Sequence, residues 1–188
     1  AFHEAGHAVA GWFLEHADPL VKVSIVPRGV AALGYAQYLP KEQFLYQTEQ
    51  LLDEMCMAFG GRAAEEIVFG KISTGALSDL ERITKMAYSM VTVYGMNKEI
   101  GNLSYYDSKA SEYTFQKPYS EATAEKIDRE VKRIIDECYE RTKKLLMEHR
   151  HHLEAVAQEL LKKEILFQND LERLIGKRPF DKPTTYQQ

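Results

Sequence analysis

The sequence predicts a mainly α-helical domain that carries a small β-sheet or hairpin. Apolar residues recur at helical spacing through most of the chain, whereas extended patterns lie only between residues 21 and 39. The chain has 188 residues, of which 45% are hydrophobic, which is enough for one good core but not for two large domains. We therefore expect residues 1–188 to form a single domain, with an N-terminal lobe over 1–115, a helical C-terminal part over 116–176 and a polar tail over 177–188.

The first segment is predicted to be a helix followed by a hairpin. Residues 1–16 carry an apolar stripe that ends at Asp18-Pro19. Residues 21–26 and 33–39 then have extended patterns, separated by a Pro-Arg-Gly turn. We expect these two runs to form a sheet of two or three strands.

Further helices are predicted from apolar spacing and from capping residues. One is expected to continue from residue 48 to residue 69, although Gly60 and Gly61 each cost about 1 kcal/mol of helix propensity, so something is expected to pack closely there. Ser78 and Glu81 have the spacing of a capping box for the next helix. The remaining predicted helices cover residues 120–149, with Ser120 as the cap, residues 153–163 and residues 169–175.

Composition excludes several classes of partner and anchor. The formal net charge is −4, so no basic surface favours nucleic acid. The two cysteines, Cys56 and Cys138, lie within helical patterns and not in a C-x-x-C pair, which predicts buried thiols in a reducing compartment. No apolar run approaches the length of about 18 residues that spans a bilayer. Because the chain does not begin with Met, we expect it to be part of a longer protein that carries any membrane segment.

Chemistry is concentrated in the run His3-Glu4-Ala5-Gly6-His7. H-E-x-x-H is a signature of zinc metalloproteases, since residues four apart stand on one helix face and two imidazoles there converge on one ion. Glu4 lies beside that face and is predicted to be the general base that takes a proton from the attacking water.

The third metal ligand is not decided by the motif. A metzincin continuation would need Gly and His where the chain has Ala10 and Phe13, so that class is excluded. Downstream carboxylates are the candidates, and Glu65, Glu66 and Asp79 all follow glycine-containing runs.

Four motifs in order carry a resemblance to a known family. They are H-E-A-G-H at 3–7, V-S-I-V-P-R-G at 23–29, G-G-R-A-A-E-E at 60–66 and S-T-G-A-L-S-D-L at 73–80. Together they resemble the peptidase domain of FtsH, the membrane-anchored AAA+ protease, and of its mitochondrial m-AAA relatives, over essentially the whole chain. Residues around 102–106 and 118–121 look closer to bacterial FtsH.

The resemblance implies a zincin-like fold and a specific site. The aspartate that closes T-G-A-x-x-D in this family is the third ligand, so His3, His7 and Asp79 are expected to hold one Zn²⁺ per chain, which makes residues 1–115 the metal-site lobe. Glu65 is expected to orient a ligand histidine, with a role as third ligand as the minor alternative.

The resemblance also implies a biological setting. It implies an endopeptidase that degrades unfolded or membrane proteins, a homo-hexamer, and an AAA+ module before this chain that uses ATP. The expected location is the bacterial inner (plasma) membrane with this domain on the cytoplasmic side, and the mitochondrial inner membrane is the alternative. Two other functions stay open, a catalytically silent hexameric assembly domain and another kind of zinc hydrolase.

Two further features allow alternative interpretations. The segment 31–39 is either a strand to which a substrate adds by main-chain hydrogen bonds or an internal hairpin with covered edges. The histidines at 149, 151 and 152 are expected to form a solvated face and not a second metal site.

Overall fold

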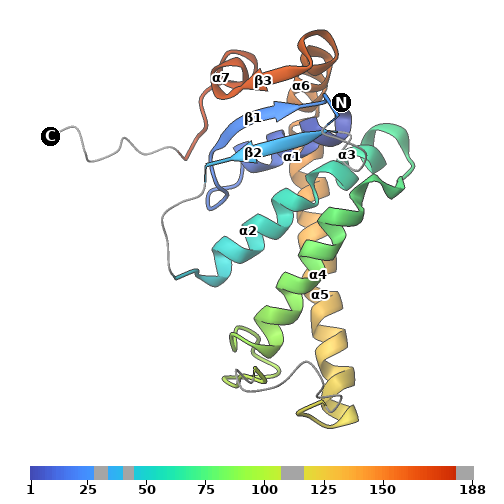
Figure 1. Ribbon diagram of the computed structural model, residues 1–188, viewed down its shortest axis with the longest axis vertical. Coiled ribbons are helices and arrows are strands. Elements are labelled where there is room, and N and C mark those ends of the chain that lie inside the picture. The colour runs from blue at the N-terminus through green and yellow to red at the C-terminus, as the bar shows by residue number, and fades with distance from the viewer. Residues whose placement is uncertain (28–33, 40–44, 107–116, 181–188) are drawn as a thin grey trace, which may run out of the picture.

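The computed structural model describes residues 1–27, 34–39, 45–106 and 117–180, and it shows a mainly helical domain with a small three-stranded sheet (Figure 1). This confirms the predicted fold class. The elements in chain order are α1 (Phe2–Trp12), β1 (Leu20–Ser24), β2 (Tyr35–Tyr38), α2 (Thr48–Ala58), α3 (Gly60–Phe69), the short 3₁₀ helix η1 (Thr74–Ala76), α4 (Leu77–Thr92), α5 (Glu121–Glu148), α6 (Arg150–Lys163), β3 (Ile165–Phe167) and α7 (Gln168–Ile175).

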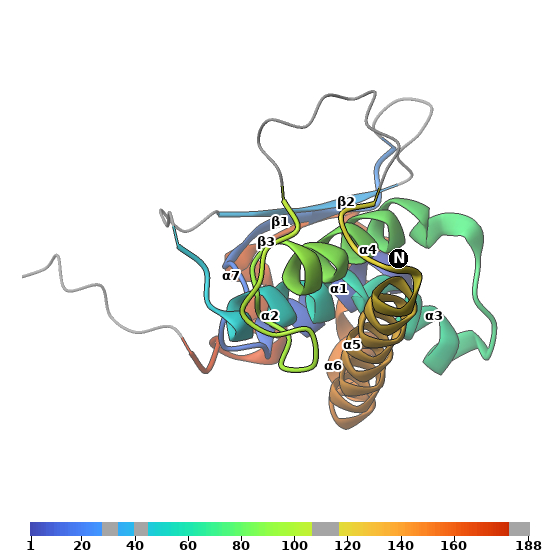
Figure 2. The same cartoon turned by 90° about the horizontal axis from the view of Figure 1, so that it is seen from below.

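Helix α1 lies at the centre of the domain, with the sheet on one side and α5 and α6 on the other (Figure 2). Its approach to α3 is close because two glycines face each other. A Cβ atom on Gly6 would lie 2.1 Å from the carbonyl oxygen of Gly60, and one on Gly60 would lie 2.4 Å from the carbonyl oxygen of Gly6. The two backbones are therefore in direct contact, which is the close packing that the Gly-Gly pair predicts.

The sheet has the strand order β2-β1-β3 and is antiparallel throughout. Val23 pairs with Ala36 on one side and with Leu166 on the other. The β1–β2 hairpin was predicted, whereas β3 was not, because a three-residue strand between two helices has too little periodicity to detect. Among the described residues β2 is an edge strand.

Two predicted helix details are wrong. The predicted helix 48–69 is interrupted at Phe59, so that α3 begins at Gly60 and meets α1. The capping box of Ser78 and Glu81 is not formed, because α4 begins one residue earlier and continues from η1. Ser73 caps η1, since its side chain accepts a hydrogen bond from the backbone of Gly75 at 3.2 Å, whereas α4 has no side-chain cap.

Helices α4 and α5 run side by side and extend away from the rest of the domain (Figure 1). Ser120 caps α5 as predicted, because its side chain accepts a hydrogen bond from the Thr123 backbone. A break at His149 separates α5 from α6, and the His149 ring stacks on Phe13 at 3.7 Å between centroids, so this histidine is packed against α1's end and not fully solvated.

The start of the predicted tail is held in place. Arg178 is buried and donates hydrogen bonds to the carbonyl oxygens of Leu14 at 2.8 Å and Ala17 at 2.7 Å, just beyond α1. Residues 181–188, the end of the polar tail predicted from the sequence, lie outside the described residues. No helix within the described ranges has both the length and the apolar character needed to cross a membrane.

Candidate metal centre

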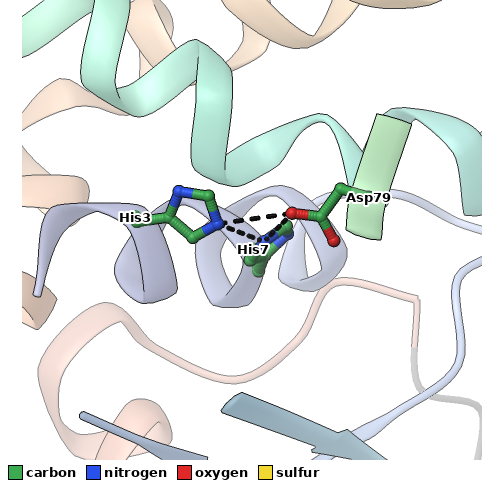
Figure 3. Close-up of side chains that lie close together, drawn as sticks. All are labelled: His3, His7 and Asp79. Atoms are coloured by element: carbon green, nitrogen blue, oxygen red, sulfur yellow. Dashed lines mark hydrogen bonds and ion pairs between the residues drawn. The ribbon is translucent and has the colours of Figure 1, made fainter. Parts of the chain in front are cut away.

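His3, His7 and Asp79 meet at one point (Figure 3). The two histidines project from one face of α1, as their four-residue spacing predicts, and Asp79 projects from the first turn of α4. The Nε2 atoms of His3 and His7 are 3.1 Å apart. One carboxylate oxygen of Asp79, Oδ2, lies 3.3 Å from His3 Nε2 and 3.2 Å from His7 Nε2.

These separations fit a zinc ion. A tetrahedral ion with bonds of about 2.0–2.1 Å separates its ligand atoms by about 3.3–3.4 Å, close to the three observed separations of 3.1, 3.2 and 3.3 Å. Within the described part of the chain, this is the one group of three or more His, Cys, Asp or Glu side chains able to share an ion. Two imidazoles and one carboxylate are the donor set of a catalytic zinc site that keeps a position open.

His7 is held by α2 through its other ring nitrogen. Its Nδ1 atom donates to the carbonyl oxygen of Met57 at 2.9 Å, which directs Nε2 toward the centre, where it is able to bind a metal once it has lost its proton. The sequence contains no signal for this contact, because any residue at position 57 would offer the same carbonyl.

His3 is held by α3. Glu65 Oε2 lies 3.7 Å from His3 Nδ1, and Glu65 Oε1 accepts a hydrogen bond of 2.6 Å from Ser73. Glu65 therefore faces the rear nitrogen of His3 and is not one of the three converging groups. Gly61 lies against the His3 ring, where a Cβ atom would come within 2.4 Å of Nε2.

The centre attracts positive charge. Burial opposes ionisation of Asp79, but hydrogen bonds from His3 and His7 hold the pKa of Asp79 well below its ordinary value. Burial likewise works against a charged His7, yet the hydrogen bond and charge of Asp79, helped by the charge of Glu4, raise the pKa of His7. A cation at this point is therefore stabilised by the carboxylates around it.

The side chain of Glu4 extends from α1 toward Gly34, the residue before β2. Burial raises the pKa of Glu4, while the neighbouring His7 and His3 partly oppose that change. A Cβ atom on Gly34, the residue before β2, would lie 3.1 Å from Glu4 Oε1. Gly34 thus leaves room for the Glu4 carboxylate, a role that the sequence did not reveal.

Residues 1–174 match the sequence profile of Peptidase family M41. The chain belongs to this family. Its M41 relatives include the mitochondrial inner membrane m-AAA protease component AFG3L2 of Mus musculus, which is 55% identical over 188 residues covering 100% of this chain and 23% of the relative. They also include the ATP-dependent zinc metalloprotease FtsH of Rhodothermus marinus, 59% identical over 182 residues, 96% of this chain and 26% of the relative.

The M41 assignment confirms the predicted family and the prediction of a peptidase, and its relatives are named as an m-AAA protease component and as an ATP-dependent zinc metalloprotease. The chain spans about a quarter of the length of these relatives, at 23% and 26%. A third relative, FtsH of Parabacteroides distasonis, is 56% identical over 178 residues, 95% of this chain and 26% of the relative. Bacterial and mitochondrial relatives are similarly alike, so the choice between them stays a prediction, as does the division of the chain at residues 115 and 176.

Proposed function

We propose that this M41 chain is the endopeptidase domain of an ATP-dependent protease, with His3, His7 and Asp79 as the ligands of one zinc ion and Glu4 as the general base. One observation carries this proposal. Three donor atoms from α1 and α4 form a triangle of zinc dimensions, and the half-buried Glu4 lies beside it. Glu65, which contacts the rear of His3, is the orienting residue and not the third ligand.

The residues of this chain suit hydrolysis of a peptide bond. When bound, zinc would act as a Lewis acid that acidifies a water molecule and polarises the peptide carbonyl. Glu4 accepts the proton of the attacking water and then donates it to the leaving amine. Its raised pKa suits both steps, since a base whose pKa approaches the working pH both accepts and returns a proton. An intact Glu4 also counts against a catalytically silent assembly domain.

The substrate is expected to bind in extended form beside β2. Within the described residues this strand is at the edge of the sheet. Gly34, the residue before it, lies next to the Glu4 side chain. Main-chain hydrogen bonds to an edge strand are largely blind to sequence, which suits unfolded polypeptides. Residues 31–33 of the segment proposed from the sequence lie outside the described residues.

For the whole protein we propose a homo-hexamer whose AAA+ module uses ATP to deliver unfolded or membrane proteins. The names of the relatives support the use of ATP and the membrane setting, because they include an ATP-dependent zinc metalloprotease and an m-AAA protease of the mitochondrial inner membrane. The hexamer is proposed from the family resemblance. The location follows as a bacterial inner membrane with this domain on the cytoplasmic side, or the mitochondrial inner membrane.

Metal content tests the ligand set. Elemental mass spectrometry after dialysis is expected to find about one zinc per chain in the wild type and in Glu4→Gln, and little in Asp79→Ala. Glu4→Gln is expected to leave casein uncut. Full zinc retention by Asp79→Ala would remove Asp79 from the ligand set and make Glu65 the ligand to examine. Products trimmed only from chain ends would indicate an exopeptidase.

A further inference from the structure

Cys56 on α2 and Cys138 on α5 are buried free thiols that lie side by side. The Cys56 thiol points at the Cys138 carbonyl oxygen at 3.6 Å, and the Cys138 thiol points at the Leu52 carbonyl oxygen on α2 at 4.0 Å. One hydroxyl, that of Thr142, donates to the carbonyl oxygens of both cysteines at 3.0 and 2.9 Å. The two helix backbones are therefore in close approach at this pair.

The partly exposed Arg141 side chain contacts the buried Cys56 sulfur. Arg141 Nη1 lies 3.7 Å from the Cys56 sulfur, and Arg141 Nη2 forms an ion pair of 2.8 Å with the buried Asp53. The Arg141 side chain is 51% exposed, whereas that of Asp53 is 3% exposed. Because Arg141 is a partly exposed contact of the buried Cys56 sulfur, its displacement is the opening through which we expect a small oxidant to reach that sulfur.

The surroundings shift the pKa values of the two thiols in opposite directions. A hydrogen bond from Cys138, assisted by the Arg141 cation and the Thr142 hydroxyl, lowers the pKa of Cys56 in spite of its burial. The same hydrogen bond, together with burial, raises the pKa of Cys138. A thiol with a lowered pKa beside a second thiol is the arrangement of cysteine pairs that form disulfides reversibly.

We propose that Cys56 and Cys138 are a redox-active dithiol that a peroxide converts to an intramolecular disulfide joining α2 to α5. The Cys56 thiolate attacks one oxygen of hydrogen peroxide, which breaks the O–O bond, forms a sulfenic acid and releases hydroxide that takes up a proton as water. The Cys138 sulfur then attacks the sulfenic sulfur, loses its own proton and releases a second water. Two electrons pass from the sulfurs to the peroxide, and a low-molecular-weight thiol reverses the reaction.

The disulfide is expected to affect the metal centre through one residue, Met57. Cys56 is followed by Met57, whose carbonyl accepts the hydrogen bond from His7 Nδ1 at 2.9 Å. An S–S bond of about 2.05 Å draws the last turn of α2 toward α5, and the Met57 carbonyl moves with that turn. The disulfide form is therefore expected to hold zinc more weakly. This consequence rests on the proposed zinc ligands, whereas the disulfide itself does not.

Peptide mapping tests the disulfide. Zinc-loaded protein is treated with hydrogen peroxide, unfolded in the presence of iodoacetamide and digested for mass spectrometry. The wild type is expected to give a linked peptide pair containing Cys56 and Cys138 that a reductant separates. Cys138→Ser, the matched control, is expected to give instead a sulfenic acid at Cys56 that dimedone traps. Full alkylation of both cysteines after peroxide, or a sulfinic acid without any linked pair, would overturn the proposal.

Zinc affinity tests the coupling, after peroxide is removed and with a chromophoric chelator as competitor. The oxidised wild type is expected to bind zinc at least about tenfold more weakly than the reduced protein, and reduction is expected to restore the affinity. Peroxide-treated Cys56→Ser is expected to keep its affinity. Equal affinity in the oxidised and reduced wild type would refute the coupling through Met57. Absence of zinc binding in untreated wild type would instead refute the proposed function.

Discussion

Gly61 offers a direct test of how α3 shapes the metal centre. In Gly61→Ala the added Cβ would lie 2.4 Å from His3 Nε2 and 2.5 Å from its Cδ2 and Cε1 atoms. Ordinary contact begins at 3.4 Å, so the ring has to retreat by about 1 Å. Zinc–ligand distances tolerate only about 0.2 Å. We therefore expect His3 to be lost as a ligand and zinc affinity to fall by at least about 100-fold, more than for loss of an outer contact.

The same substitution should not weaken the fold. Alanine is favoured over glycine by about 1 kcal/mol inside a helix, and a metal-free His3 side chain is able to swing away. Metal-free Gly61→Ala is thus expected to unfold at the same denaturant concentration as the metal-free wild type, or a higher one. This separates a damaged metal centre from a damaged domain.

Chelator competition with purified protein measures the zinc affinity, and urea denaturation followed by circular dichroism measures the stability. Gly75→Ala is the matched control, because its Cβ would meet only the Ser73 hydroxyl at 3.3 Å, and its affinity should stay within about threefold of wild type, less than the effect of a lost outer contact. If Gly61→Ala bound zinc as tightly as the wild type, the assignment of His3 as a ligand packed under α3 would be wrong.

Three further predictions concern pH and buried polar groups. Because Asp79 raises the pKa of His7 above 6.5, protons compete with zinc there. Chelator competition should show affinity falling at least about tenfold per pH unit below that pKa, and an unchanged affinity at acidic pH would contradict His7 as a ligand. The Tyr38 hydroxyl is buried without a hydrogen-bond partner among the described residues, so Tyr38→Phe should raise the free energy of unfolding by about 1 kcal/mol in urea titrations, and a marked loss would reveal a partner. Arg178→Met should lower the free energy of unfolding by about 3 kcal/mol, because carbonyl oxygens beyond α1 lose a buried charged donor; an unchanged urea midpoint would show that this contact does not stabilise the domain.

Much of the architecture was predictable because it depends on local periodicity. The cap at Ser120 and the apolar stripes of the long helices follow from residues close together in sequence. The break at Phe59 was not predictable, because the helical pattern continues through it. Its structural reason is the close contact of Gly60 with Gly6 on α1, which only the fold shows. The strand β3 was not predicted for a similar reason, because it is defined by pairing with β1 and not by its own sequence pattern.

The residues of the metal centre also fall into two groups, those that the sequence predicts and those that only the fold brings together. The sequence by itself determined that His3 and His7 converge and that Glu4 stands beside them, because helix geometry relates residues four apart without help from the rest of the chain. It left Glu65, Glu66 and Asp79 as rival carboxylates, and the family resemblance then selected Asp79 as the expected ligand and Glu65 as the expected orienting residue.

Only the tertiary structure placed Asp79 Oδ2 3.2 Å from His7 Nε2 and turned Glu65 toward the rear of His3. The contact of Met57 with His7 and the pairing of Cys56 with Cys138 likewise appear only in the folded chain. The physical reason is that α2, α3, α5 and α6 pack against α1, and α4 packs against α2 and α5, through residues distant in sequence. The positions where helix backbones meet are set by which side chains are small enough to allow it.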